Sequence, residues 1–520
     1  MDASRATSDA TPCHPSLSCP VIIAILAASL MVAAFAISSQ SYWIDEATSL
    51  IVAMAPDPAE AWKYAKAVGG STIQMPLYHI YLYAWHKMFG GGEWIMRASN
   101  LPWFLLAQLA FLVLLRDRPR WAMTAALLSA VSPTVWMYLD EARPYVMQYA
   151  AGCWLAAAVA RSAMDNHRGT AISSPLLMAA LTAATVVLLG SSLLGTVWAA
   201  GFLAALGWLH ATRPSPAETS GPASLLLLLG CAAAAVILGI YYVWTWSEAG
   251  EGYHRAGLSL VSLPYIAYEF FGFAGYGPGK LQLRNSVAGS LVQALPVMLP
   301  LALVVGALLL FLVLRPRSKS PSRRAMVAWL LALLLPSVII LGAFYLSAYR
   351  PLPRHFLPAF PAVVLALAAL LNLAWAQKHM VWRAVAVLLP LLWLGSALNL
   401  RWREVHAKDD YRTAARIPAA ALADNKEVWW AADAAAAYIY LTPVALEEVP
   451  GRAWAMQAPS WDAIRFKFPP RVIVISKPDI YDPQGSIARY AAENRFMPAL
   501  QLQAFTIFTR EGEQLPSAGD

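Results

Sequence analysis

The sequence predicts a polytopic α-helical membrane protein that ends in a small α/β domain. Of its 520 residues, 59% are hydrophobic and only 13% are charged, whereas soluble globular proteins have roughly 45–50% apolar and about 25% charged residues. Long apolar runs recur up to residue 400, and after it short apolar strands alternate with helical patterns. These observations together exclude an ordinary cytosolic enzyme.

Eleven apolar runs have the length of about 17–25 residues that a transmembrane helix needs. They cover residues 20–39, 98–115, 121–138, 144–160, 173–190, 193–210, 223–246, 287–314, 325–346, 356–376 and 381–400. An alternative for the first run is a signal peptide, but no basic region lies close to its start and no clear cleavage site follows. We therefore expect a tail over 1–19 and a transmembrane module over 20–400.

The charge distribution predicts the direction of the chain. Loops on the side of the N-terminus carry fourteen basic and five acidic residues, whereas the opposite loops carry ten of each. Because basic loops stay in the cytoplasm, the N-terminus is expected to be cytoplasmic, and an odd span count puts 401–520 on the outer side. The net charge of +8 then requires no nucleic-acid partner.

Two other functional classes are disfavoured. The four cysteines form neither a CxxC pair nor a Cys/His cluster at zinc spacing, which argues against a cysteine-based metal site. No Lys, Arg, Asp or Glu lies in the interior of a predicted span, and ion pathways usually need such residues. A charge-coupled transporter is therefore not expected.

Two outer loops, 40–97 and 247–286, are unusually long. The first predicts a helix after the Pro/Asp segment 56–58, and then an interfacial amphipathic helix over 75–92. His79 and His86 in that segment are more typical of interfacial histidines than of metal ligands. The loop 247–286 is rich in glycine and aromatic residues, which favours irregular backbone on the membrane surface.

The tail 401–520 predicts a small domain with about three strands. Helical patterns cover 409–424, 434–441 and 485–496, and strand patterns cover 427–433, 471–476 and 502–509. Such alternation is typical of an α/β domain.

Two clusters at the predicted outer face contain adjacent acidic residues. Asp45 and Glu46 follow the first span, at the boundary between water and membrane. Adjacent carboxylates at this position are suited to act as a general base or as a pair of metal ligands. The alternative is a solvated loop with an aromatic interface belt. The second cluster, between the third and fourth spans, is suited to bind a sugar together with a phosphate, and its alternative is a helix N-terminus whose acids complement the dipole. It contains Asp140, Glu141, Arg143 and Tyr145.

Two further clusters are basic. Arginines at a helix start are unfavourable for the helix dipole, so those that open the tenth span indicate a negative partner such as phosphate; the alternative is snorkelling to lipid headgroups. That cluster consists of Tyr349, Arg350, Arg354 and His355. Lys280 and Arg284 form either a phosphate-contacting loop or a basic lip.

Five segments, in this order along the chain, resemble the bacterial GT-C glycosyltransferases. They are Asp45-Glu46, residues 75–100, the EARPY motif at 141–145, PRHFLPAFP at 353–361 and KDDYRTAARI at 408–417. That superfamily includes protein O-mannosyltransferases, lipid A aminoarabinose transferases and rhizobial-type galacturonosyltransferases. The resemblance covers nearly the whole chain.

The resemblance implies an inverting transferase in the bacterial inner membrane, with its active site and tail in the periplasm. Its donor would be a polyprenyl-phosphate sugar, and its acceptor an envelope lipid, polysaccharide or protein. Asp45 and, less directly, Glu46 would be catalytic, and Arg354 would bind the donor phosphate, with no obligatory cofactor and with room for a divalent cation. One departure is Ser191-Ser192, where many members carry a His-Tyr-type pair.

Two alternatives have a different chemistry. A flippase for lipid-linked glycans would need polar groups along its crossing path, whereas the acid and arginine clusters lie on one face only. A non-catalytic envelope assembly protein would need far fewer spans as an anchor. Sugar transfer from a lipid phosphate needs a base and positive charge for the departing phosphate, and the clusters offer both.

Overall fold

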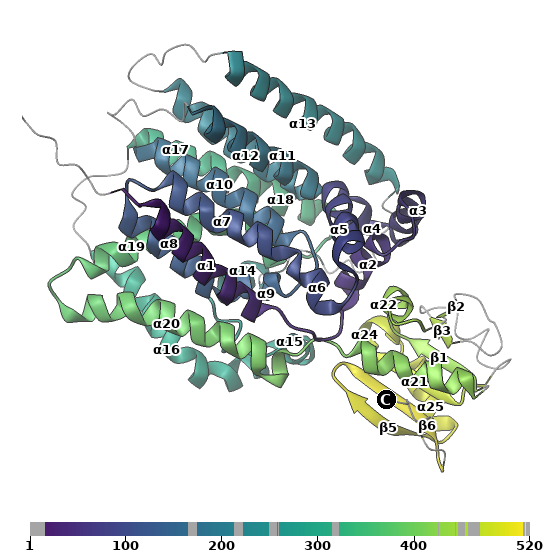
Figure 1. Ribbon diagram of the computed structural model, residues 1–520. Coiled ribbons are helices and arrows are strands. Elements are labelled where there is room, and N and C mark those ends of the chain that lie inside the picture. Colours follow the sequence, from purple (N-terminus) through teal and green to yellow (C-terminus); the bar gives the residue numbers. More distant parts are fainter. Residues whose placement is uncertain are drawn as a thin grey trace, which may run out of the picture.

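The computed structural model describes residues 16–164, 174–212, 222–248, 257, 259, 261–314, 322–424, 426–442, 444–445, 453–455, 469–512 and 515. A helical bundle comes first along the chain, and a mixed sheet with its own helices follows it. Figure 1 shows the sheet region, in green and yellow, at one end of the bundle.

The long helices lie side by side in the bundle, and short helices gather at the end that faces the sheet (Figure 1). The long helices, several of which consist of two or three consecutive elements, are built from α1 (Cys19–Ala36), α6 (Glu93–Ala98), α7 (Asn100–Leu114), α8 (Pro119–Val131), α9 (Pro133–Leu139), α10 (Tyr145–Met164), α11 (Pro175–Ser191), α12 (Leu193–Ala211), α13 (Pro222–Glu248), α16 (Val287–Leu314), α17 (Arg323–Trp329), the π-helical η1 (Leu330–Leu334), α18 (Leu335–Leu346), the 3₁₀ helix η2 (Pro353–Ala359), α19 (Phe360–Trp375) and α20 (Met380–Trp402). The short ones are α2 (Ile44–Ala53), α3 (Pro58–Val68), α4 (Gly70–Ile73), α5 (Pro76–Phe89), α14 (Ser262–Phe270) and α15 (Lys280–Asn285).

Seven segments of the described chain are long and apolar enough to cross a membrane. They are Cys19–Ala36, Glu93–Leu114, Leu193–Ala211, Val287–Leu314, Arg323–Leu346, Pro353–Trp375 and Met380–Trp402. Helices α8 and α9 make an eighth if they form one span, bent by 55° where Ser132 is extended and Pro133 starts the next helix. The chain is therefore a multi-pass membrane protein.

Each of the eleven predicted spans coincides with a helix, but three of them, α10, α11 and α13, are not among these eight. Helix α11 has 17 residues, and the apolar part of α13 is the equally short segment Leu229–Thr245. Helix α10 is buried along most of its 20 residues, and membrane helices that pack on other helices are rich in small residues instead of strongly apolar ones. The structure supports seven or eight spans, and eleven stays a prediction.

Helix α10 lies at the centre of the bundle and packs against α7, α11 and α19. Close approach is needed at Gly152, because a Cβ atom there would lie 2.6 Å from the carbonyl oxygen of Pro358. The absence of a side chain therefore lets η2, which carries Arg354, lie directly against the helix that begins with Tyr145.

The two helices expected in the first outer loop are confirmed. Asp57 caps α3 by accepting from the backbone N–H groups of Ala59 and Glu60, and α5 corresponds to the amphipathic segment, which ends at Gly90 with φ of +92°. In the second loop the prediction of irregular backbone is correct only for 271–279, because α14 and α15 occupy its flanks. Residues 249–256, for which irregular backbone is also predicted, lie outside the described residues.

The irregular segment 271–279 packs tightly against the end of α20 and the 3₁₀ helix η3 (Glu404–His406). A Cβ at Gly275 would lie 1.8 Å from the carbonyl oxygen of Ser396, and one at Gly279 would lie 1.8 Å from that of Val405. These glycines therefore fix the start of α15, and with it Lys280, beside the linker to the sheet.

The C-terminal region is a mixed sheet with helices on both faces. Its elements are α21 (Tyr411–Ala423), β1 (Val428–Ala431), α22 (Ala434–Ile439), β2 (Val444–Ala445), β3 (Ala453–Ala455), β4 (Val472–Ser476), α24 (Pro478–Tyr481), α25 (Ser486–Glu493), β5 (Phe496–Leu502) and β6 (Phe505–Arg510). The strand order is β2-β3-β1-β4-β6-β5; β1 pairs parallel with β3 and β4, whereas β6 is antiparallel to β4 and β5. The side chains of Val428 and Trp430 face α21 and α22, and those of Trp429 and Ala431 face α24 and α25.

The α/β prediction is confirmed for this region, and two details are wrong. Six strands lie in the described residues instead of about three. The predicted strand 502–509 is correct for 505–509, which belong to β6, but its start is wrong, because Leu502 ends β5 and Ala504, with φ of +63°, turns the chain between the two strands. An alanine carries no turn signal, so the apolar pattern continues through the turn unbroken.

Candidate active site

The predicted acidic and basic clusters meet where the bundle faces the sheet region. Asp45 and Glu46 lie in the first turn of α2, and the EARPY segment forms the turn between α9 and α10. Arg354 comes from η2, and Lys280 is the first residue of α15. Four segments that are distant in sequence thus supply one site.

Asp45 forms an ion pair with Arg354. The Arg354 Nη1 donates to the Asp45 Oδ2 at 2.6 Å, and the two side chains are 24% and 26% exposed. Burial by itself would raise the pKa of Asp45, but Arg354, then Arg143 and Lys280, outweigh it and lower the pKa below its ordinary value. Asp45 is therefore an ionised carboxylate within the reach of three cations.

Glu46 is adjacent in sequence but completely buried. Its carboxylate accepts two bonds of 2.8 Å from the guanidinium of Arg97, one of 3.0 Å from the Ala142 N–H and one of 3.1 Å from the Lys408 ammonium. Burial opposes ionisation, yet Arg97 and then Lys408 lower the pKa of Glu46 to about 2. With all its oxygens occupied, Glu46 holds the site together and does not face the solvent.

The EARPY turn is fixed from both sides. Asp140 accepts from the N–H and the hydroxyl of Ser38, at 2.5 and 2.9 Å, and Asn100 donates to the carbonyl of Glu141 at 2.7 Å. Glu141 in turn pairs with Lys280 at 3.3 Å. These bonds tie the end of α1, the start of α7 and α15 to the same turn.

Arg143 is a second cation close enough to Asp45 to lower its pKa. It is 2% exposed, and its Nη1 donates to the hydroxyl of Ser49 at 2.7 Å. Its Nε has no hydrogen-bond partner among the described residues, and the guanidinium lies 6.0 Å from the ring centroid of Tyr145. A buried arginine with an unused N–H donor can donate a hydrogen bond to a further oxygen atom, such as one of a phosphate.

A cavity of about 120 Å³ adjoins this set of charges. Its lining includes Trp43, Glu141, Tyr265, Glu269, Lys280 and Lys408. The Lys280 ammonium lies 4.6 Å from the centroid of a Trp43 ring. The cavity thus combines aromatic walls with acidic and basic groups, which suits a polar ligand with an apolar face.

The fold is similar to that of a known membrane protein. ArnT from Cupriavidus metallidurans in the apo state aligns with a TM-score of 0.55 at 13% identity, over 94% of this chain and 97% of that chain. The same protein bound to undecaprenyl phosphate aligns with a TM-score of 0.51 at 14% identity, over 96% and 99%. The chain therefore has an ArnT-like fold, in agreement with the resemblance to the GT-C enzymes that the sequence indicates. No protein-family model and no curated protein matches the sequence.

Four of the expected binding residues lie beside other groups or in solvent. Arg284 pairs with Asp479 of the sheet region at 2.6 Å. Tyr349 is 41% exposed and packs on Phe344, and Arg350 is exposed. The Nδ1 of His355 accepts from the Leu352 N–H at 3.1 Å, and its ring also lies against Phe344. Arg354 is thus the member of its cluster that reaches Asp45.

Three contributors to the site were not singled out from the sequence. Arg97 and Lys408 lie within segments that resemble the GT-C enzymes, but spacing alone gives no reason to choose them. Glu269 is buried in α14, where it accepts from the Tyr138 hydroxyl at 2.6 Å, and burial raises its pKa to about 7. A single acid in the apolar segment 262–273 was the available signal for Glu269.

His79 and the Ser191-Ser192 pair have structural contacts. The Nε2 of His79 lies 2.8 Å from the carbonyl of Thr72, and burial lowers the pKa of His79 to about 4. Ser192 caps α12 by accepting from the Gly195 N–H, and it also accepts from Gln148. Among the described residues no group of three or more His, Cys, Asp or Glu side chains is arranged to hold a metal ion.

Proposed function

We propose that the protein transfers a sugar from a polyprenyl-phosphate donor to an envelope acceptor, with inversion at the anomeric carbon. The observation that carries this proposal is the partly exposed Asp45–Arg354 pair, close to Arg143 and Lys280. It places one carboxylate beside the positive charge that a departing phosphate needs. The similarity in fold to ArnT, which has been crystallised with undecaprenyl phosphate, supports a lipid carrier of that kind.

Donor binding would exchange the partner of Arg354. In the free protein Asp45 neutralises Arg354, and a donor phosphate would compete with Asp45 for the same guanidinium. The phosphate would then be held by Arg354 with Arg143 or Lys280. Asp45 would lose its strongest cation contact, so its pKa would rise and it would become a better base.

The reaction follows from that arrangement. The acceptor oxygen forms a bond to C1 of the sugar while the C1–O bond to the phosphate breaks, and the electron pair leaves with the phosphate. The acceptor proton passes to Asp45. A single displacement of this kind inverts C1, and the low basicity of the phosphate leaving group means that little general acid is required.

The proposed location is a bacterial inner membrane with the site and the sheet region in the periplasm. It rests on the excess of basic residues in the loops on the N-terminal side. A reporter that is active only in the cytoplasm, fused after Asp520, should be silent. Activity of that reporter would place the site on the wrong side for this donor.

The direct test is transfer by the purified protein in nanodiscs, supplied with a radiolabelled polyprenyl-phosphate sugar and envelope extract. We expect labelled product with inverted stereochemistry, and we expect it to persist in the presence of a chelator because arginine and lysine supply the positive charge. Mass spectrometry of envelope lipids and glycans from a deletion strain identifies the acceptor. Movement of labelled lipid between leaflets without a product would indicate a flippase instead, and neither transfer nor movement would favour an assembly role.

A further inference from the structure

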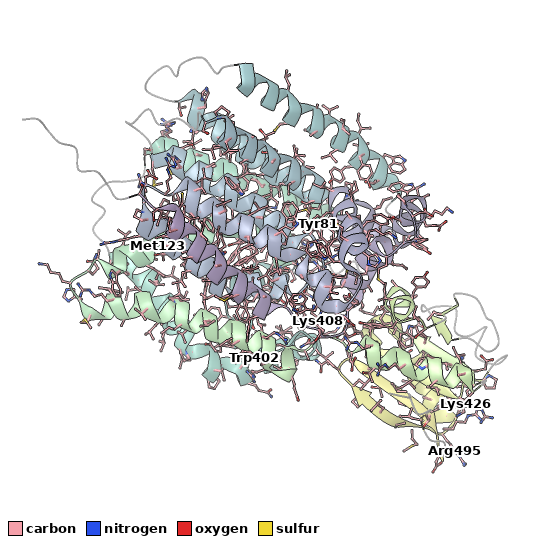
Figure 2. The ribbon with its side chains drawn as sticks, viewed as in Figure 1. Tyr81, Met123, Trp402, Lys408, Lys426 and Arg495 are labelled. Atoms are coloured by element: carbon pink, nitrogen blue, oxygen red, sulfur yellow. The ribbon has the colours of Figure 1, made fainter. Side chains whose placement is uncertain are left out.

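The sheet region contacts the outer helices beside the candidate active site. Arg412 pairs with Glu93 at 2.5 Å, the Tyr440 hydroxyl accepts from the Tyr42 N–H at 2.8 Å, and α22 packs on α2. Lys408 lies in the linker between η3 and α21, and Figure 2 shows it where the bundle meets the sheet region. Lys408 contacts Glu46, the residue next to Asp45.

Both the ammonium group and the backbone N–H of Lys408 have partners in the bundle. Its ammonium lies 3.1 Å from the Glu46 Oε2 and 3.6 Å from the Asp140 Oδ2, and it donates to the carbonyl of Asp140. Its backbone N–H donates to the side chain of Gln40 at 2.9 Å. The side chain is 13% exposed, so the charge is largely shielded from water and depends on these partners.

The charges around Lys408 balance only when it is present. Glu46 and Asp140 supply two carboxylates, and Arg97, at 2.8 and 3.9 Å, supplies one guanidinium. Lys408 supplies the second positive charge. Since an uncompensated charge in a buried site is unfavourable, loss of Lys408 would force a carboxylate to take up a proton or the cluster to open.

Such a change would reach Asp45 through the backbone. Glu46 accepts from the N–H groups of Trp43 and Ala142, at 3.3 and 3.0 Å, so its orientation fixes the start of α2 against the EARPY turn. Asp45 occupies that same helical turn. A shift of the turn by about 1 Å would move the carboxylate out of line with the acceptor.

We propose that Lys408 is a positioning residue, through which the C-terminal region orients Asp45 for transfer by way of Glu46. This inference rests on the proposed function. It gives the C-terminal region a part in the reaction itself. The linker supplies Lys408, which balances the charges of Glu46, Asp140 and Arg97 next to the helical turn that carries Asp45.

The test compares Lys408→Met with Lys408→Arg and with Arg412→Met, which removes a different ion pair between the same two regions. We expect kcat of Lys408→Met to fall on the order of 10²-fold, while the KM for the polyprenyl-phosphate sugar stays within about twofold because Arg354 is intact. Lys408→Arg should restore most of kcat, since it keeps the charge. Arg412→Met should keep a kcat near that of the wild type.

A double variant separates positioning from folding. If Lys408 acts through Glu46, Lys408→Met should add little to the loss of kcat in a Glu46→Gln background. The double variant also restores charge balance, so its thermal unfolding temperature should recover if Lys408→Met alone folds poorly. If the loss of kcat in the double variant equals the product of the fold losses in the two single variants, the inference is overturned.

The outcomes distinguish this inference from the proposed function. Absence of transfer by the wild-type protein would remove the proposed function, and full activity of Asp45→Asn would remove Asp45 as its base and with it the role of Lys408. Transfer by the wild type that Asp45→Asn abolishes, together with an unchanged kcat in Lys408→Met, would remove only the role of Lys408. Equal losses of kcat in Lys408→Met and Arg412→Met would show that docking in general, and not this charge cluster, is what matters.

Discussion

Asp45 and Glu46 are neighbours in one helical turn, and each is paired with an arginine, yet their surroundings differ. The Asp45–Arg354 pair has side chains that are 26% and 24% exposed and share one hydrogen bond of 2.6 Å. The Glu46–Arg97 pair is fully buried, with two bonds between the partners and further bonds from Ala142 and Lys408. The first pair has room for a third group, whereas the second does not.

This difference separates the reactive pair from the structural pair. A partly exposed ion pair contributes less to stability than a buried one, so a ligand can replace one partner at a smaller cost. A buried pair loses several kcal/mol when one partner is removed, because the remaining charge is left without water. We therefore expect variants at Asp45 and Arg354 to change chemistry, and variants at Glu46 and Arg97 to change folding.

The largest effect is expected for Asp45→Asn, which keeps the shape of the side chain and removes its charge. Loss of a general base lowers turnover by about 10²- to 10⁴-fold, while donor binding should survive. Single-turnover transfer by protein checked for folding measures this. A rate close to that of the wild type would transfer the role to another carboxylate, with Asp140, Glu141 and Glu269 as the next to test.

Arg97→Met should destabilise the protein by about 3–5 kcal/mol, because Glu46 would remain buried and charged. Denaturant unfolding in detergent measures this loss. The matched control is Arg97→Met with Glu46→Gln, which removes both charges and should recover much of the stability. If the single variant unfolds like the wild type, the buried pair does not have the structural role assigned to it.

The pH dependence of stability tests Glu46 in another way. Its pKa falls from an ordinary value of 4.5 to about 2 in the folded protein, so its contribution is complete above pH 4.5 and is lost as the pH falls toward 2. A carboxylate of this kind contributes about 2–3 kcal/mol. In Glu46→Gln the slope of stability against pH in this window should become shallower, and an unchanged slope would contradict the low pKa.

Arg354→Ala should weaken donor binding by about 10- to 150-fold, the loss expected for a charge-assisted contact of about 1.5–3 kcal/mol. The protein should still fold, because this pair is partly exposed and shares a single hydrogen bond. Arg354→Lys should restore affinity only in part, since lysine lacks the planar fork of two donors. Equilibrium binding of a radiolabelled polyprenyl-phosphate sugar is the measurement, and unchanged affinity in Arg354→Ala would exclude it from the donor site.

The smallest effect is expected for Arg284→Ala. Arg284 pairs with Asp479, with exposed fractions of 35% and 54%, and does not reach Asp45. Loss of an exposed pair costs about 0–1 kcal/mol, so donor affinity should change at most about fivefold. The same binding assay measures the donor affinity of this variant. A loss of affinity as large as that of Arg354→Ala would show that Arg284 contacts the donor phosphate, as its sequence context predicts.

The sequence was informative where a pattern is local. Apolar length predicts the helices of the bundle, and Asp57 with Pro58 predicts the start of α3. It was less informative where one pattern fits two structures, as in 502–509, where Ala504 turns the chain within an apolar run. Likewise, the apolar run 144–160 predicts a span, but the sequence does not show that the corresponding helix, α10, is buried by other helices along most of its length.

The candidate site shows the same division. The sequence by itself determined which chemical groups are present at the outer face, since carboxylates and arginines beside apolar spans stand out by composition alone. Only the tertiary structure decided which of them meet, because pairing depends on distances between segments that are up to 362 residues apart, as for Glu46 and Lys408. Burial then divided two adjacent acids into a partly exposed Asp45 and an enclosed Glu46, since exposure is a property of the packed neighbours and not of the residue.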